Sequence, residues 1–148
     1  MKIYLDTCSL QRPLDSKTQI RIILEAEAVL GILTLCESEE VDIVSSEALL
    51  FEIERNPNVA RLQYALEALS RAQAFVVLSE QVEQRAKALH AAGIKPLDAL
   101  HLASAEEAKA DYLCTCDDGL VKRAKAVKGL KVKVVSPIEI IEEIEQWS

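Results

Sequence analysis

Short apolar runs alternate along the chain with longer stretches in which apolar residues recur every three or four positions. Short runs of this kind predict buried strands, and the longer period predicts helices that pack by one face. The predicted strands cover about residues 2–5, 41–44, 74–78, 112–115 and 132–135. The predicted helices cover about residues 17–38, 47–55, 58–71, 80–92, 97–109, 117–127 and 137–147, and residues 7–16 are predicted to form a loop.

Turn and capping residues stand between these segments. Ser45 or Ser46 is placed to cap the helix that follows the second strand, and Ser79 to cap the helix after the third. Gly93 is expected to stop one helix and Pro96 to open the next. Strands that alternate with helices predict an α/β fold, a three-layer sandwich with a mostly parallel sheet covered on both faces. Residues 1–148 are expected to form a single domain, because the chain has one domain's length and no linker.

Composition narrows the functional classes. The net charge of −7 argues against broad binding to long DNA, which requires many Lys and Arg contacts. It leaves open a nucleic-acid substrate held through metal ions, since bound cations reverse the sign of a site. The four cysteines show no zinc-binding spacing and are expected to be small buried hydrophobic residues. No leader or membrane-spanning stretch is recognisable, so a cytoplasmic protein with reduced thiols is expected.

Carboxylates stand where the predicted strands end. Asp6 ends the first strand, and Asp117 follows the fourth with Asp118 beside it. Asp98 lies in the first turn of its helix, and Glu52 lies on the helix after the second strand. Strand ends of one sense share an edge of a parallel sheet, so these acids could converge on one pocket. Converging carboxylates raise each other's pKa and attract cations, and oxygen ligands select Mg²⁺ or Mn²⁺ over zinc.

Each of these aspartates also has an ordinary structural explanation. Asp6 could cap the next turn by accepting hydrogen bonds from nearby backbone N–H groups. Asp98 is favourable at a helix N-terminus whatever its function. Asp117 or Asp118 could be the N-cap of a helix.

Glu52 is one of three acids on the same short helix. A solvated helix face would explain Glu47 and Glu54. Glu52 shares its stripe with Leu49 and Ile53, so it is predicted to point nearer the core than a surface charge should.

The two histidines are not assigned to the chemistry. His101 lies one turn beyond Asp98 and is expected to satisfy a hydrogen bond on a packed helix. His90 lies late in its helix, where a cation is favourable.

Four motifs occur in order along the chain and together suggest a family. They are Leu5-Asp6-Thr7, Ser46-Glu47-Ala48-Leu49-Leu50-Phe51-Glu52-Ile53, Pro96-Leu97-Asp98-Ala99-Leu100-His101-Leu102-Ala103 and Thr115-Cys116-Asp117. With these motifs the chain resembles the PIN-domain family of small nucleases, which includes the VapC-type toxins of bacterial toxin–antitoxin systems. The most specific are the opening Leu-Asp-Thr and the motif around Asp98. The Thr-x-Asp step is specific only in their company.

The resemblance implies a five-stranded parallel sheet with strand order 3-2-1-4-5. It also implies an endoribonuclease that hydrolyses RNA phosphodiesters with a water activated by Mg²⁺ or Mn²⁺. The metal ligands and catalytic acids carried over by position are Asp6, Glu52, Asp98 and Asp117. The supporting polar residues would be Thr7 and Thr115.

Two positions depart from the family pattern or leave it open. Many relatives have Asn where Cys8 stands, so the loss of a polar contact near Asp6 is expected here. Asp118 stands beside Asp117, so the resemblance leaves open which of the two faces the metal.

Candidate contacts to RNA and to proteins complete this interpretation. Residues Arg12, Lys95, Lys122 and Arg123 have loop or helix-start positions from which they could bind the RNA backbone, although ordinary solvated charge would explain them too. The family implies a homodimer, and the toxin role implies an antitoxin that inserts an Arg or Lys into the acidic groove. The apolar helices at residues 17–38 and 58–71 could supply the partner or dimer surface.

Two other classes remain beside the nuclease. The same fold could be a catalytically weak or inactive binding module that acts through a protein partner. A phosphoacceptor α/β domain also has an Asp after its first strand. A receiver, however, expects its phosphoacceptor Asp after strand three, where this chain has Leu78-Ser79-Glu80, and a haloacid-dehalogenase-like phosphatase expects a second Asp at the position of Cys8.

Overall fold

A computed structural model describes residues 1–147. Its centre is a five-stranded parallel sheet in the order β3-β2-β1-β4-β5, as predicted. The strands are β1 (Lys2–Leu5), β2 (Asp42–Ser46), β3 (Ala74–Val76), β4 (Tyr112–Cys114) and β5 (Lys133–Val135). On the middle strand, Ile3 pairs with Ile43 of β2 on one side and with Tyr112 of β4 on the other. The carboxyl ends of β1 and β4 are therefore neighbours.

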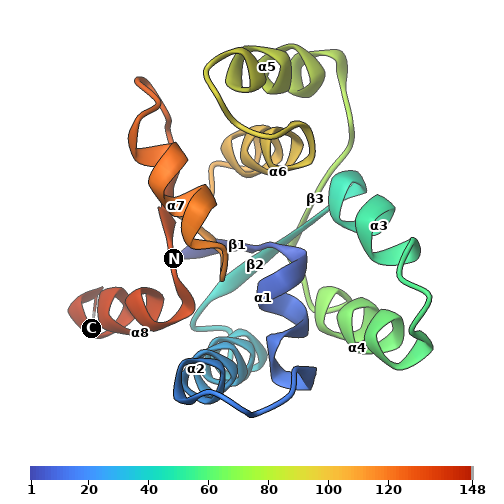
Figure 1. Ribbon diagram of the computed structural model, residues 1–148, viewed down its shortest axis with the longest axis vertical. Coiled ribbons are helices and arrows are strands. Elements are labelled where there is room, and N and C mark those ends of the chain that lie inside the picture. The colour runs from blue at the N-terminus through green and yellow to red at the C-terminus, as the bar shows by residue number, and fades with distance from the viewer. Residues whose placement is uncertain (148) are drawn as a thin grey trace.

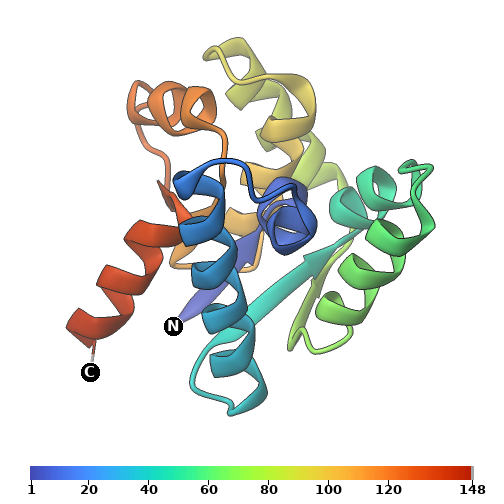
Figure 2. The ribbon, with the colours of Figure 1, turned by 60° about the horizontal axis from the view of Figure 1, so that its bottom comes forward.

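Helices cover both faces of the sheet. Figure 1 shows α5, α6 and α7 on one side of the sheet and α2, α4 and α8 on the other. The helices after the first loop are α2 (Ile20–Glu37), α3 (Glu47–Glu54), α4 (Val59–Leu69), α5 (Glu80–Ala91), α6 (Pro96–Glu107), α7 (Asp118–Lys125) and α8 (Pro137–Trp147). The turned view of Figure 2 shows α2 and α8 side by side, in agreement with their extensive contacts. The predicted α/β fold is confirmed.

The predicted loop at residues 7–16 is wrong. The segment instead forms α1 (Thr7–Gln11) and a short 3-10 helix, η1 (Arg12–Leu14). The side chain of Asp6 accepts a hydrogen bond from the Ser9 N–H at 3.0 Å and so caps α1. Leu10 is buried, so one apolar side chain anchors this short helix to the core. Helix α2 consequently begins at Ile20, three residues later than predicted.

The predicted caps and helix ends are found. Ser46 Oγ accepts from the Leu49 N–H at 3.0 Å, and Ser79 Oγ accepts from the Val82 N–H at 3.2 Å. Helix α5 is followed by Gly93 at φ 110°, a conformation that a side chain rarely tolerates. These local signals explain why most of the predicted element boundaries lie within two residues of the observed ones.

Apolar side chains are not all on the inner faces of their helices. On α4, Val59 and Leu66 follow the helical spacing of apolar residues but are 62% and 37% exposed. On α2, Ile20 and Leu24 follow the helical spacing but are 76% and 51% exposed. The core face of α2 is made instead by residues such as Val29, Ile32 and Cys36. Periodicity located these helices but did not choose their buried faces.

The cysteines are all free thiols within the described residues. Cys36, Cys114 and Cys116 are buried, as expected, but Cys8 is exposed, which corrects the expectation for that residue. Across residues 1–147, every helix is too short or too polar to span a membrane.

Candidate functional site

Asp6 is a buried carboxylate at the carboxyl end of the central strand. Its Oδ1 accepts from the Ser9 N–H and from the Cys8 thiol, the latter at 3.1 Å. Burial, followed by the neighbouring Cys8, raises the pKa of Asp6 well above its usual value, because water no longer stabilises the charge. The predicted capping role of Asp6 is thus real. The cap alone does not require a buried acid, because Asn or Ser would serve as well.

The end of β4 lies directly beside Asp6. The Asp6 N–H donates to the carbonyl oxygen of Cys114 at 3.1 Å. Thr115 is fully buried at the next position, and its Oγ1 accepts from the Asp117 N–H at 3.1 Å. A side-chain hydrogen bond from Thr115 also favours the charged form of Asp6. Thr115 therefore contacts both aspartates.

Asp117 and Asp118 have different partners. Asp117 is the N-cap of α7, with Oδ1 accepting from the N–H groups of Gly119 at 2.8 Å and Leu120 at 3.3 Å. Asp118 forms a two-pronged ion pair with Arg21 of α2, at 2.6 and 2.7 Å, which holds the pKa of Asp118 below its usual value. The negative charge of Asp117 also raises the pKa of Asp98.

Glu52 is brought to the site by α3. Its Oε1 accepts hydrogen bonds from His101 Nε2 at 2.9 Å and from Thr7 Oγ1. Partial burial acts to raise the pKa of Glu52, but these hydrogen bonds outweigh it and lower that pKa. Glu47, in contrast, accepts from the Leu78 N–H, and Glu54 is exposed. Among the three acids of α3, Glu52 is the one that contacts the residue next to Asp6.

Asp98 connects the remaining acids electrostatically. It lies in the first turn of α6, one turn before His101. Burial raises the pKa of Asp98, and the negative charges of Asp117 and Glu52 raise it further against the opposing effect of His101. Glu52 and Asp117 are therefore both close enough to act on the charge of Asp98. The helix dipole alone would lower this pKa, so it does not account for the site.

The donor set fits a hard divalent cation in its chemistry. All four candidate ligands are carboxylates, and the repulsion around Asp98 is what a cation would relieve. Within residues 1–147, no three His, Cys, Asp or Glu side chains form a ready-made metal cluster. Oxygens of Asp6 and Glu52 are already engaged in hydrogen bonds to the protein, so binding a cation would require small changes in their side-chain positions.

Arg12, predicted as an RNA contact, is held in internal ion pairs. Its Nη1 lies 2.9 Å from Asp15, and its Nη2 lies 3.0 Å from the buried Glu25. Arg21 shares the Glu25 carboxylate at 3.3 Å. Arg12 therefore fastens η1 to α2, and it is less available to a ligand than expected.

The other predicted cations remain accessible to different degrees. Lys95 and Lys122 are exposed. The Nη2 atom of Arg123 lies 4.0 Å from Asp117 Oδ2, and its charge acts to lower the pKa of Asp98. Arg123 is thus the only one of the four that is directly tied to the carboxylates.

Sequence reasoning missed the contacts made by Tyr4. The Tyr4 hydroxyl lies 2.7 Å from Ser46 Oγ and 2.7 Å from His101 Nδ1, all in the core. His101 therefore satisfies hydrogen bonds as expected, but one of them goes to Glu52. A signal was present, because Tyr4 stands two residues before Asp6 and alternate residues of a strand share a face.

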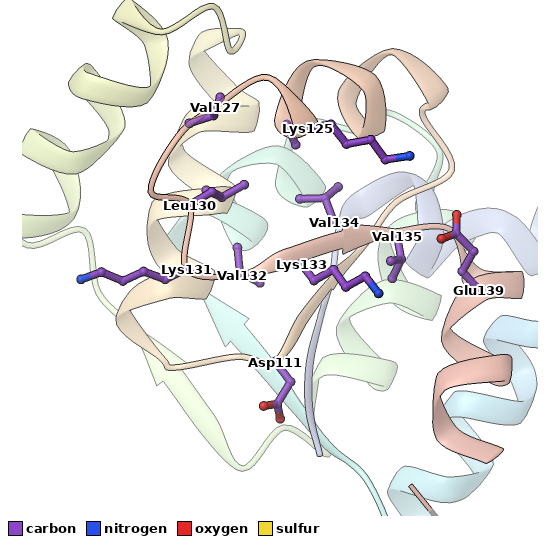
Figure 3. A pocket seen from close by; sticks show the side chains of 11 residues that line it. Asp111, Lys125, Val127, Leu130, Lys131, Val132, Lys133, Val134, Val135 and Glu139 are labelled. Atoms are coloured by element: carbon purple, nitrogen blue, oxygen red, sulfur yellow. The ribbon is translucent and has the colours of Figure 1, made fainter. Parts of the chain in front are cut away.

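A groove of about 530 Å³ lies apart from these acids. Figure 3 shows it along β5, with Lys125 of α7 above the strand and Glu139 of α8 at one end. Its lining includes the apolar residues Leu130 and Val134 and none of the four acids. Cavity size therefore does not identify the candidate site here; the converging charges do.

Comparisons with known proteins agree with this geometry. The family model for the PIN domain matches residues 3–126. The fold is similar to a chain in the crystal structure of VapBC2 from Rickettsia felis bound to a DNA fragment from their promoter. The TM-score is 0.58 with 16% identity, over 92% of this chain and 98% of that one. No curated protein matches this chain in sequence.

Proposed function

Because the chain belongs to the PIN domain family, we propose that it is a metal-dependent endoribonuclease that hydrolyses RNA phosphodiesters. The observation that carries this proposal is that Glu52 and Asp117 both lie near enough to Asp98 to raise its pKa, at the sheet edge where Asp6 is buried. Keeping like charges together costs stability, and a cation-dependent reaction gives a reason for the cost. We further propose that residues 1–148 act as one domain in the cytoplasm.

The carboxylates of Asp6, Glu52, Asp98 and Asp117 would hold Mg²⁺ or Mn²⁺. When bound, such an ion lowers the pKa of a water and neutralises charge that develops on the phosphate. The remaining roles belong to the protein itself. Thr115 and Cys8 orient Asp6, and Thr7 orients Glu52.

Basic side chains near the acids would bind the RNA backbone. Arg123 faces Asp117, so it is placed to contact a phosphate beside the metal ligands. Lys122, in the last turn of α7, and Lys95, the N-cap residue of α6, are exposed and would contact phosphates farther along the strand. Residues 119–138 contain six Lys or Arg and no acid, which favours an anionic ligand on this side of the site.

Metal titration and RNA cleavage test the proposal together. Mn²⁺ is expected to raise the melting temperature of the wild-type protein, since a ligand that binds only the folded state stabilises it. EDTA should stop cleavage of a single-stranded RNA and Mn²⁺ should restore it. Asp98→Asn should abolish both the thermal shift and cleavage, whereas Glu54→Gln, an exposed acid of α3, serves as the matched control. Cleavage that persists in EDTA, or in Asp98→Asn, would contradict the proposal.

A second candidate function is binding to a protein partner, with weak or no turnover. The observation that favours it is the exposed apolar surface formed by Leu14 of η1, Ile20 and Leu24 of α2 and Val59 of α4. Helix α2 packs on η1, and α1 packs on α4, so these residues come from adjoining elements. The similar structure is of VapBC2, a complex. We propose that an antitoxin or a second copy of the chain covers this surface.

A further inference from the structure

A buried chain of hydrogen bonds leads from the start of α3 to Glu52. Ser46 Oγ lies 2.7 Å from the Tyr4 hydroxyl, which lies 2.7 Å from His101 Nδ1. His101 Nε2 lies 2.9 Å from Glu52 Oε1. Ser46, Tyr4 and His101 are 0%, 0% and 2% exposed, so the chain is closed to solvent until it reaches Glu52.

The direction of these bonds follows from their ends. An ionised carboxylate only accepts, so His101 Nε2 must donate to Glu52. In the neutral ring, Nδ1 then accepts, and the Tyr4 hydroxyl must donate to it. Tyr4 has no second proton, so Ser46 donates to Tyr4 while its Oγ accepts from the Leu49 N–H at 3.0 Å. Every donor in the chain therefore points toward Glu52.

Tyr4 is suited to this role because it keeps its proton. Burial, the largest effect, raises the pKa of the Tyr4 hydroxyl far above its ordinary value. The Tyr4 and His101 rings also pack together, with centroids 5.6 Å apart. Losing the Tyr4 hydroxyl would leave a buried ring nitrogen without its donor, and the ring would be held less firmly against Glu52.

We propose that Tyr4 holds the His101 ring in place by donating to Nδ1, and that His101 thereby holds the Glu52 carboxylate at the acidic site through its Nε2–H. Tyr4 and His101 are positioning residues, since they act through Glu52. The role of Glu52 as a metal ligand rests on the proposed function, whereas the hydrogen bonds that position Glu52 do not. Outer partners of metal ligands commonly change metal affinity by about 10- to 100-fold when they are mutated.

The tautomer can be measured directly. Nitrogen-15 NMR of the imidazoles is simple because the chain has two histidines. In His90→Gln, only the signals of His101 remain. The expected wild-type spectrum shows a protonated Nε2 and an unprotonated Nδ1. Tyr4→Phe should leave Nε2 protonated and shift the Nδ1 signal, because that nitrogen loses its hydrogen-bond donor. A protonated Nδ1 in the wild type, or an unchanged spectrum in Tyr4→Phe, would overturn the proposal.

Metal affinity measures the effect on Glu52. Calorimetric titration with Mn²⁺ is expected to show roughly 10-fold weaker binding for Tyr4→Phe and His101→Leu. His101→Gln retains a side-chain donor and should recover part of the loss. Tyr112→Phe is the matched control, because it removes a hydroxyl of β4 that donates to Glu143, away from the site. Equal Mn²⁺ affinity in Tyr4→Phe and Tyr112→Phe would contradict the positioning role.

Different results would contradict the proposed function and the positioning role of His101. If the wild type binds no Mn²⁺, the proposed function fails, and a double-mutant cycle on the melting temperature decides the positioning. For Glu52→Gln and His101→Leu, a combined loss clearly smaller than the sum of the single losses supports it. Additive losses overturn it.

Discussion

Asp6 and Asp98 of the candidate site are unfavourable for stability, and the proposed function would explain why acids stand at these positions. Asp6 is buried although Asn or Ser would cap α1 equally well, and Asp98 is half-buried among like charges. Asp118 shows the opposite case, since it is fully exposed and paired with Arg21. Neighbouring acids therefore differ in their effect on the stability of the fold, and substitutions can distinguish them.

Asp6→Asn is expected to abolish RNA cleavage while raising the melting temperature at neutral pH. The folded-state pKa of Asp6 is raised, so the folded protein binds this proton more tightly than the unfolded chain does. Its contribution to stability therefore grows as the pH falls and is unfavourable above the folded-state pKa. Asn keeps the cap without the charge. Thermal melts in EDTA should show the gain shrinking toward acidic pH, and a variant less stable than wild type at neutral pH would contradict this account.

Asp117→Asn and Asp118→Asn should separate the two neighbouring acids. Both changes preserve hydrogen-bonding oxygens, and Asn is a good N-cap for α7. We expect Asp117→Asn to lower the cleavage rate by at least about 100-fold, as loss of a metal ligand would. Asp118→Asn should leave the rate nearly unchanged, because Arg21 holds Asp118 outside the acidic cluster. The reverse ranking in a single-turnover assay would show that the metal ligand was misassigned.

The N-cap residue of one helix connects the fold to the candidate site. Helix α3 begins at the Ser46 cap, and the same hydroxyl contacts Tyr4, so the cap is part of the chain that reaches Glu52. Helix α5 begins at a similar cap, Ser79, without such a connection. The two helices therefore provide a comparison between a cap that is only structural and one that also supports the site.

Ser46→Ala and Ser79→Ala should both lower the free energy of unfolding by about 1 kcal/mol, the usual cost of losing an N-cap. Ser46→Ala should cost more, because it also removes the hydrogen-bond partner of a buried tyrosine hydroxyl. Urea unfolding measures both losses, and cleavage should fall only in Ser46→Ala. Equal losses of stability with equal activity would mean that the Ser46–Tyr4 contact is unimportant.

The molecule is acidic, and exposed apolar side chains stand on η1, α2 and α4. The net charge of −7 disfavours indiscriminate binding to long DNA. Residues 122–133 contain six Lys or Arg, so an anionic ligand is expected to bind in that region. The exposed residues of η1, α2 and α4 lie on elements that contact α1, the helix capped by Asp6. A partner on this surface would be close enough to affect the site.

Leu24→Glu is expected to weaken self-association or partner binding. Leu24 is half-exposed, so the change should perturb the fold little, whereas a charge in a buried interface is costly. Val77→Glu is the matched control, since Val77 is 54% exposed beyond β3. Sedimentation of both variants should show a loss of dimer in Leu24→Glu alone. A dimer that survives Leu24→Glu would place the contact elsewhere.

The sequence by itself determined the features that depend on neighbouring residues or on a repeating pattern of apolar residues. Capping residues such as Ser46 act within one helical turn, and strand and helix periods differ, so the α/β order and the acids at strand ends were predictable. The tertiary structure decided which distant groups meet. Arg21 binds Asp118 across 97 positions, and His101 meets Tyr4 across 97 positions and Glu52 across 49. Such contacts depend on strand order and on which helix face is buried, and neither leaves a signal within a few residues of Asp118 or Glu52.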